Sequence, residues 1–312
     1  MAVLSIVPAA VLLLLAMLLL AAGVVLVVRT VRAARRYPSE VAVGTPWTPG
    51  APESGAPLVP DGPAQAGALL WRWAGILVGG SAAYLTITTG TLGRGELFAA
   101  PIFGLCALAG TLLGELTMPS PGGATRRAQL HVRRVRDYVP PVLGAIVAVA
   151  TVVLVVLASV TTAAASPDDM GRAGRYLLCS TGAGSGPWTG SFYTLPGSGL
   201  VLVGLALAGL SLRRIVRRPR PADTAAADDA LRRRSAEVVT AAVGLLVLVP
   251  LLGVGWTAGV ELIALAGNCG HDWWTGAGWG LVGLAVVAFA LAGWCVVLLL
   301  WPLARSRART AA

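Results

Sequence analysis

The stretch RRRSAEVVTAAVGLLVLVPLLGVGWTA, residues 232–258, decides the fold. Three arginines open it, and no ionisable side chain occurs from Val238 to Ala258. A bilayer core about 30 Å thick needs about 20 predominantly apolar residues in one helix. Barrel strands alternate apolar and polar residues, which this run does not. The stretch therefore predicts a transmembrane helix with cationic side chains at one end.

The same arrangement recurs along the chain, so we expect an all-α polytopic transmembrane helical bundle of about seven spans. Its composition agrees, because 56% of the residues are hydrophobic and 12% are charged, whereas soluble domains carry about 25% charged residues. The connection Gly90–Gly95 is so short that the second and third spans must be antiparallel neighbours. The predicted spans are residues 3–28, 71–89, 96–116, 140–160, 199–212, 238–258 and 278–303, and the short fifth span has the alternative of beginning as early as Phe192.

Arginine groups beside the spans indicate the orientation. With the N-terminus outside and seven crossings, the groups at 29–36, 126–136, 213–220, 232–234 and 305–309 all fall in the cytoplasm, as does the C-terminus. Only Arg94, Arg172 and Arg175 then lie outside, and Arg72 lies at the inner edge. We expect a multi-pass plasma-membrane protein whose arginine groups contact anionic lipid headgroups. The net charge of +10 does not indicate nucleic acid, because aromatic residues are not interleaved with the arginines.

Three segments are predicted along the chain. Residues 1–36 form a first transmembrane helix with a basic flank, which we expect to be retained because its charges follow the apolar run. Residues 37–66 form a proline-rich, disordered cytoplasmic linker. Residues 67–312 form a six-helix bundle of three hairpins, 67–118, 138–220 and 232–309, with long outer loops at 161–198 and 259–277.

The four cysteines divide into two kinds. Cys179 and Cys269 each lie in a long outer loop, in a compartment that permits disulfides. We predict a disulfide that joins the two hairpins. Two free thiols are the alternative, because the distance between the loops cannot be read from the sequence. Cys106 and Cys295 lie within spans and are interpreted as packing residues.

Ionisable residues are absent from the span centres, which weighs against an ion-coupled transporter. The outer face carries weak binding candidates, because histidine and carboxylates there suit a cation, a polar headgroup or acid–base chemistry. The alternative is a solvated loop with aromatic anchors at the membrane interface. The binding candidates are Glu96, Glu261, His271 and Asp272, and the aromatic candidates are Trp188, Tyr193, Trp273, Trp274 and Trp279.

No cofactor, metal ligand or catalytic residue is assigned. The chain has no lysine and no Walker-type glycine-rich loop, and its two histidines are expected on opposite sides of the membrane. Tyr84, Thr86 and Thr88 give the second span its polar face, which would line a passive pathway or serve helix packing. Three small-residue pairs are compatible with close helix packing: Gly75 with Gly79, Gly110 with Gly114, and Gly255 with Gly259.

One part of the chain has a familiar pattern. It comprises LGRGELFAAPIFGL at 92–105, GELT at 114–117 and RRVRDYVP at 133–140. In this stretch the chain resembles uncharacterised multi-pass membrane proteins of high-GC actinobacteria. The resemblance implies a host type and a membrane address, and it transfers no functional residue.

Three functions are compatible with these patterns. The first is a non-enzymatic accessory or assembly partner in envelope processes, with a membrane-protein partner. The second is a transporter or permease for a neutral or lipidic solute. The third is a membrane enzyme or metal site at the outer face near His271 and Asp272.

Overall fold

The computed structural model describes residues 63–117, 135–179, 181–217, 225–269 and 273–300. Within them the chain is helical apart from one antiparallel two-stranded hairpin. The predicted first span and the predicted linker as far as residue 62 lie outside these residues. The elements are α2 (Pro63–Thr89), α3 (Arg94–Thr117), the 3-10 helix η1 (Val135–Asp137), α4 (Pro141–Ala163), β1 (Leu177–Leu178), β2 (Gly184–Ser185), α5 (Ser191–Arg217), α6 (Ala225–Cys269) and α7 (Trp273–Leu300).

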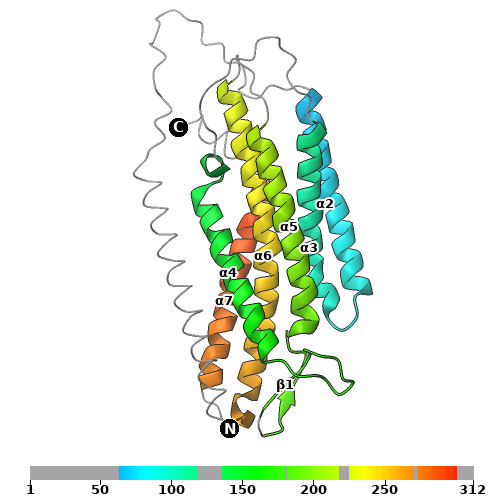
Figure 1. Ribbon diagram of the computed structural model, residues 1–312, viewed down its shortest axis with the longest axis vertical. Coiled ribbons are helices and arrows are strands. Elements are labelled where there is room, and N and C mark those ends of the chain that lie inside the picture. The colour runs from blue at the N-terminus through cyan, green and yellow to red at the C-terminus, as the bar shows by residue number, and fades with distance from the viewer. Residues whose placement is uncertain (1–62, 118–134, 180, 218–224, 270–272, 301–312) are drawn as a thin grey trace, which may run out of the picture.

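Five of the described helices, α3 to α7, are long and apolar enough to cross a membrane. The chain is therefore a multi-pass membrane protein. The helix α2 is not among these five, because Arg72 and several hydroxyl side chains lower its hydropathy. It nevertheless packs along α3 in the antiparallel arrangement that the short Gly90–Gly95 connection predicted (Figure 1). A total of seven spans and their orientation remain predictions.

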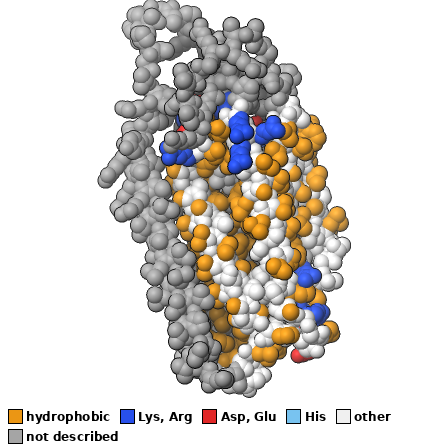
Figure 2. All heavy atoms as spheres, viewed as in Figure 1, with side chains coloured by type: hydrophobic (Ala, Val, Ile, Leu, Met, Phe, Trp, Pro, Cys, Tyr) orange, Lys and Arg blue, Asp and Glu red, His pale blue; other side chains and the backbone are white. Residues whose placement is uncertain are grey.

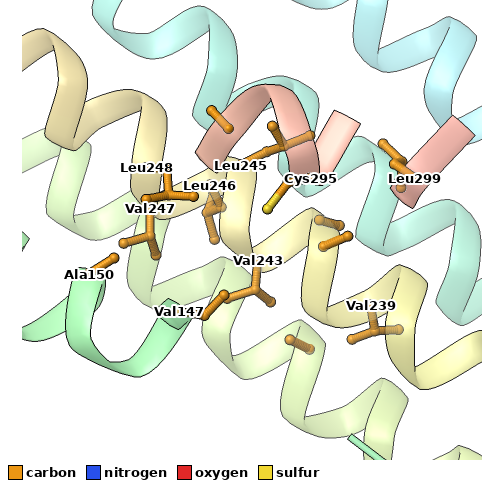
Figure 3. Close-up of a cluster of buried hydrophobic side chains, with 14 of the residues drawn as sticks. Val147, Ala150, Val239, Val243, Leu245, Leu246, Val247, Leu248, Cys295 and Leu299 are labelled. Atoms are coloured by element: carbon orange, nitrogen blue, oxygen red, sulfur yellow. The ribbon is translucent and has the colours of Figure 1, made fainter. Parts of the chain in front are cut away.

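The helix α6 is the centre of the bundle. Its apolar window is 78% buried, whereas the other four candidate spans bury between 22% and 39% of theirs. It packs against α3, α4, α5 and α7. Figure 3 shows Val147 and Ala150 of α4, and Cys295 of α7, beside the apolar side chains of α6. Apolar composition alone does not explain this position, because α7 is equally free of charge and buries only 28% of its apolar window.

The outward surface of the bundle is apolar as well. Leu77 of α2, Val155 of α4, Leu202 of α5 and Phe289 of α7 are all exposed, Phe289 to 68%. Figure 2 shows such side chains between the two ends of the bundle. Soluble monomers rarely expose a continuous apolar surface of this kind. Contact with lipid tails is its physical explanation.

Arginine side chains gather at the two ends of the bundle (Figure 2). One end, here called the inner end, holds Arg232, which donates to the Ile215 carbonyl at the end of α5. Arg72 of α2 is at the inner end too, because it donates to the Leu299 carbonyl near the end of α7. The other end, here called the outer end, holds Arg94 beside the start of α5. For these three arginines the division agrees with the predicted one, whereas the groups at 29–36 and 305–309 lie outside the described residues.

Glycines allow the helices to approach closely. A Cβ atom built on Gly75 of α2 would lie 2.9 Å from the Cα of Gly110 on α3. A Cβ atom built on Gly259 of α6 would lie 2.8 Å from the carbonyl oxygen of Gly278 on α7. The predicted glycine pairs thus serve contacts within the chain.

Both long outer loops are shorter than the predicted ranges, because the helices extend into them, and for α5 this confirms the alternative start near Phe192. The helix α5 begins at Ser191 and includes Pro196, which has no N–H for the carbonyl of Phe192. The Arg94 guanidinium donates to that carbonyl instead, at 3.2 Å. The helix α6 continues to Cys269, since Leu265 and Cys269 pack against the connection between α4 and α5. The predicted loop 259–277 is therefore helical over most of its length.

Candidate functional site at the outer end

Residues Ala164–Gly190, here called the outer loop, connect α4 to α5 and are described apart from residue 180. Trp188 is 3% exposed and packs in one cluster with Leu177 and with Leu265 of α6. Its indole Nε1 donates to the carbonyl of Thr161 in α4, at 2.8 Å. Trp188 is therefore an internal anchor. Its interpretation as an interfacial aromatic residue was wrong, and the same holds for the buried Tyr193.

A disulfide between Cys179 and Cys269 ties the outer loop to the end of α6. The two Cα atoms are 5.6 Å apart, within the usual range for a disulfide. The hydroxyl of Thr181 also donates to the carbonyl of Asn268, at 3.2 Å. The predicted disulfide between the two hairpins is confirmed. Cys106 and Cys295 are free, and Cys295 is buried in the core.

Asp168 organises the charged side of the outer loop. Its carboxylate accepts hydrogen bonds from the Arg172 side chain at 2.7 Å and from the Arg175 side chain at 3.0 Å. It also accepts from the backbone N–H groups of Met170 and Arg172. Burial by itself raises the pKa of Asp168, but the hydrogen bonds from Arg172 and Met170 and the charge of Arg172 outweigh it, so the pKa lies below its ordinary value. Two of the three arginines predicted outside are thereby paired.

Tyr193 connects the outer loop to the turn between α2 and α3. Its hydroxyl accepts from Arg175 Nε at 3.4 Å and donates to the carbonyl of Leu92 at 2.6 Å. Leu92 has φ 60°, a left-handed conformation that costs a non-glycine residue energy. The third outer arginine, Arg94, lies 3.5 Å from the centre of the Phe192 ring, in cation–π contact.

A pocket of about 340 Å³ lies between the outer loop and the starts of α3 and α5 on one side and α6 on the other. This volume is near the lower end of the range for small-molecule sites, about 300–1,000 Å³. The pocket is lined by Gly93, Glu96, Leu97, Pro187, Thr189, Tyr193, Val249, Leu252, Gly253, Trp256 and Thr257.

Most of this lining is apolar, and few of its polar groups are free to bind. The hydroxyl of Thr257 donates to the carbonyl of Gly253 at 2.8 Å, and Tyr193 is engaged as described. Thr189 differs, because it is 2% exposed and its hydroxyl has no hydrogen-bond partner among the described residues. The carboxylate of Glu96 is exposed in the first turn of α3. The Thr189 hydroxyl and the Glu96 carboxylate are therefore the side-chain polar groups that remain for binding a ligand.

The four binding candidates from the sequence have different places. Glu96 lines the pocket. Glu261 lies one helical turn beyond Thr257 on α6, and its buried Oε2 has no hydrogen-bond partner in the described part of the chain. His271 and Asp272 lie outside the described residues, so the gathering of all four remains a prediction. In the part that is described, no three His, Cys, Asp or Glu residues are grouped to hold a metal ion.

The polar face of α2 does not contribute to the pocket. Thr86 donates to the carbonyl of Ala82 at 2.7 Å, and Thr88 donates to the carbonyl of Tyr84 at 3.1 Å. The hydrogen bonds of these hydroxyls are thus made to backbone carbonyls of α2 itself. Sequence reasoning missed Thr189 and Trp256 as lining residues, because no spacing or motif marks either of them.

No protein-family model, no curated protein and no solved structure matches this chain. The class that the structure establishes is a multi-helix membrane protein. The resemblance noted at residues 92–140 remains a prediction.

Proposed function

We propose that this chain is a non-enzymatic accessory or assembly protein of the plasma membrane, acting in envelope processes through its outer end. One observation carries the proposal: the outer loop is attached to α4 by Trp188, to α5 by Arg175 and to α6 by the disulfide. Connecting loops are ordinarily among the more mobile parts of a protein. A loop fixed in this way presents a preorganised surface, which lowers the entropy cost of binding a partner.

The inner end supplies a second contact surface in this proposal. Arg213, Arg214, Arg217 and Arg233 are all exposed there. Arginines next to membrane spans attract anionic headgroups, each with about 1 kcal/mol near the surface. Headgroup contact at this end would hold the bundle at a constant depth while the outer end meets its partner.

The test compares partner retention with and without the disulfide. Wild type and a Cys179→Ser/Cys269→Ser variant are purified from native membranes in mild detergent, and the co-purified proteins are quantified. We expect wild type to retain a membrane-protein partner that the variant loses, while both remain monodisperse. A Cys106→Ser variant is the matched control and should retain the partner. Equal retention by all three chains would contradict the proposal.

A transporter of a neutral or lipidic solute is the second candidate. The observation in its favour is that the pocket reaches Val249, near the middle of the apolar stretch of α6. Transport predicts that liposomes containing the chain move a fluorescent lysophospholipid between leaflets faster than empty liposomes. Equal rates would reject this candidate.

A further inference from the structure

We propose that the pocket at the outer end binds a single-chain amphiphile whose head is an ammonium group. This inference deepens the proposed function and rests on its outer-end role. The apolar part of the site comes from Leu97 of α3 and from Val249, Leu252 and Trp256 of α6. These side chains offer hydrocarbon contact but no hydrogen bond, which suits an alkyl chain.

The volume limits how much of a ligand can enter. About 340 Å³ is near the lower end of the range for sites that hold one small molecule. A space of this size accommodates one alkyl chain. The site therefore suits a molecule with one chain.

The chemistry of the ligand's head group follows from two pocket side chains, Thr189 and Glu96, whose oxygens have no partner among the described residues. The Thr189 hydroxyl is buried in the pocket wall with no partner among the residues described, and a buried polar group in this state costs free energy. Glu96 contributes a carboxylate at the same pocket, and this carboxylate forms no ion pair among the described residues. A ligand head with hydrogen-bond donors would suit both the Thr189 hydroxyl and the Glu96 carboxylate.

The surrounding charges favour a cationic donor over a neutral one. Arg94 is stacked on Phe192, and Arg175 is paired with Asp168, and neither forms an ion pair with Glu96 among the described residues. An ammonium head would meet the Glu96 carboxylate and the free Thr189 hydroxyl. A carboxylate head would be repelled by Glu96.

The test uses the full chain in lipid nanodiscs and a diazirine derivative of dodecylamine as the photoreactive probe. Peptide mass spectrometry locates the adducts. We expect adducts within residues 187–193 and 249–257. Unlabelled dodecylamine should compete at least about tenfold better than dodecanol, as a charge-assisted hydrogen bond implies. Dodecanoate should compete worst, and equal or better competition by dodecanoate would overturn the proposal.

Two substitutions separate the roles of the head-binding oxygens. Glu96→Gln should remove the preference for dodecylamine over dodecanol, and Thr189→Val should weaken the binding of both. Asp169→Asn and Thr88→Val are the matched controls, because both residues are exposed and neither lines the pocket. Changes of the same size in the controls would overturn the assignment.

Two glycine-to-alanine substitutions test whether the ligand occupies the pocket, without changing any polar side chain. A Cβ atom at Gly253 would lie 2.6 Å from Leu97 Cδ2, so Gly253→Ala should push this flexible side chain into the pocket and reduce labelling severalfold. Gly280→Ala on α7 meets nothing within 4 Å and should label as wild type. Equal labelling of the two variants, or adducts elsewhere in wild type, would show that the pocket is a packing gap.

The source of the amine is settled by a second competitor. Lysophosphatidylethanolamine carries the same ammonium group on a membrane lipid, so its competition would indicate a lipid from the outer leaflet, whereas competition by dodecylamine alone would indicate a free amine. Both results support the proposed chemistry. If wild type co-purifies with a partner but the probe does not label its pocket, only the proposed ligand is refuted. If the probe labels the pocket but no partner co-purifies, only the accessory role is refuted.

Discussion

Arg232 is 1% exposed although it belongs to a group of three consecutive arginines. Its guanidinium donates to the carbonyls of Ile215 at 2.8 Å and of Val216 at 3.1 Å, near the end of α5. The last carbonyls of a helix have no partner within the helix, and the helix dipole favours a cation there. One member of an apparently uniform basic group is therefore a structural cap.

This role predicts unequal effects of neighbouring substitutions. Arg232→Ala should destabilise the bundle by about 2 kcal/mol, because it removes two charge-assisted hydrogen bonds from buried carbonyls. Arg233→Ala removes the same charge from an exposed position and should change stability by less than about 0.5 kcal/mol. Denaturation of both variants in detergent measures the difference, and equal stabilities would contradict the capping role.

Asp168 predicts a pH dependence of the outer loop. Its pKa is below the ordinary value in the folded chain, so its stabilising contribution is present above the unfolded pKa and is lost as the pH falls through the folded pKa. With an unfolded value of about 3.9, the loss should begin below about pH 5. Hydrogen exchange of residues 166–179, corrected for the intrinsic exchange rate, should show protection that declines in this acid range.

Asp168→Asn provides the control for this titration. The variant cannot form the ion pairs with Arg172 and Arg175, so its outer loop should be less protected at neutral pH and should lack the acid transition. Asp169→Asn should behave as wild type, because Asp169 is exposed and forms no ion pair among the described residues. An unchanged acid transition in Asp168→Asn would assign the pH dependence to another group.

At the scale of elements, the α6–α7 hairpin depends on a backbone approach that only glycine permits. A side chain at Gly259 would meet the carbonyl oxygen of Gly278 at 2.8 Å and the backbone nitrogen of Val282 at 3.1 Å. Backbone atoms cannot rotate away as a flexible side chain can. The helices would have to separate to accept even a methyl group.

Gly259→Ala should therefore destabilise the chain by about 1–3 kcal/mol. Gly267→Ala on the same helix is the matched control, because nothing lies within 4 Å of its added Cβ. It should be neutral or should stabilise by up to about 1 kcal/mol through the higher helix propensity of alanine. Thermal unfolding in detergent gives both values, and a neutral Gly259→Ala would show that the hairpin packs more loosely.

At the scale of the whole molecule, the expected orientation makes the two ends of the bundle face different compartments. An impermeant maleimide added to intact cells should label an Asp169→Cys variant, since this residue is exposed at the outer end. It should label an Arg233→Cys variant only after the cells are opened. Labelling of Arg233→Cys in intact cells would reverse the orientation.

The candidate site was only partly predictable from the sequence. Glu96 was recognisable, because a carboxylate next to an apolar run must lie at a span end. The disulfide was recognisable, because both cysteines fall in segments on one side of the predicted membrane. Thr189 and Trp256 carried no such signal, since ordinary threonine and tryptophan residues become pocket walls only through their neighbours in space.

The sequence by itself determined the membrane class and the apolar helices α3 to α7, because lipid imposes length and hydropathy rules on each segment separately. Only the tertiary structure decided that α6 lies innermost, that Trp188 is an internal anchor and that Arg232 caps α5. These properties depend on contacts between residues far apart in the chain. Such contacts follow from side-chain packing in three dimensions, which local composition does not encode.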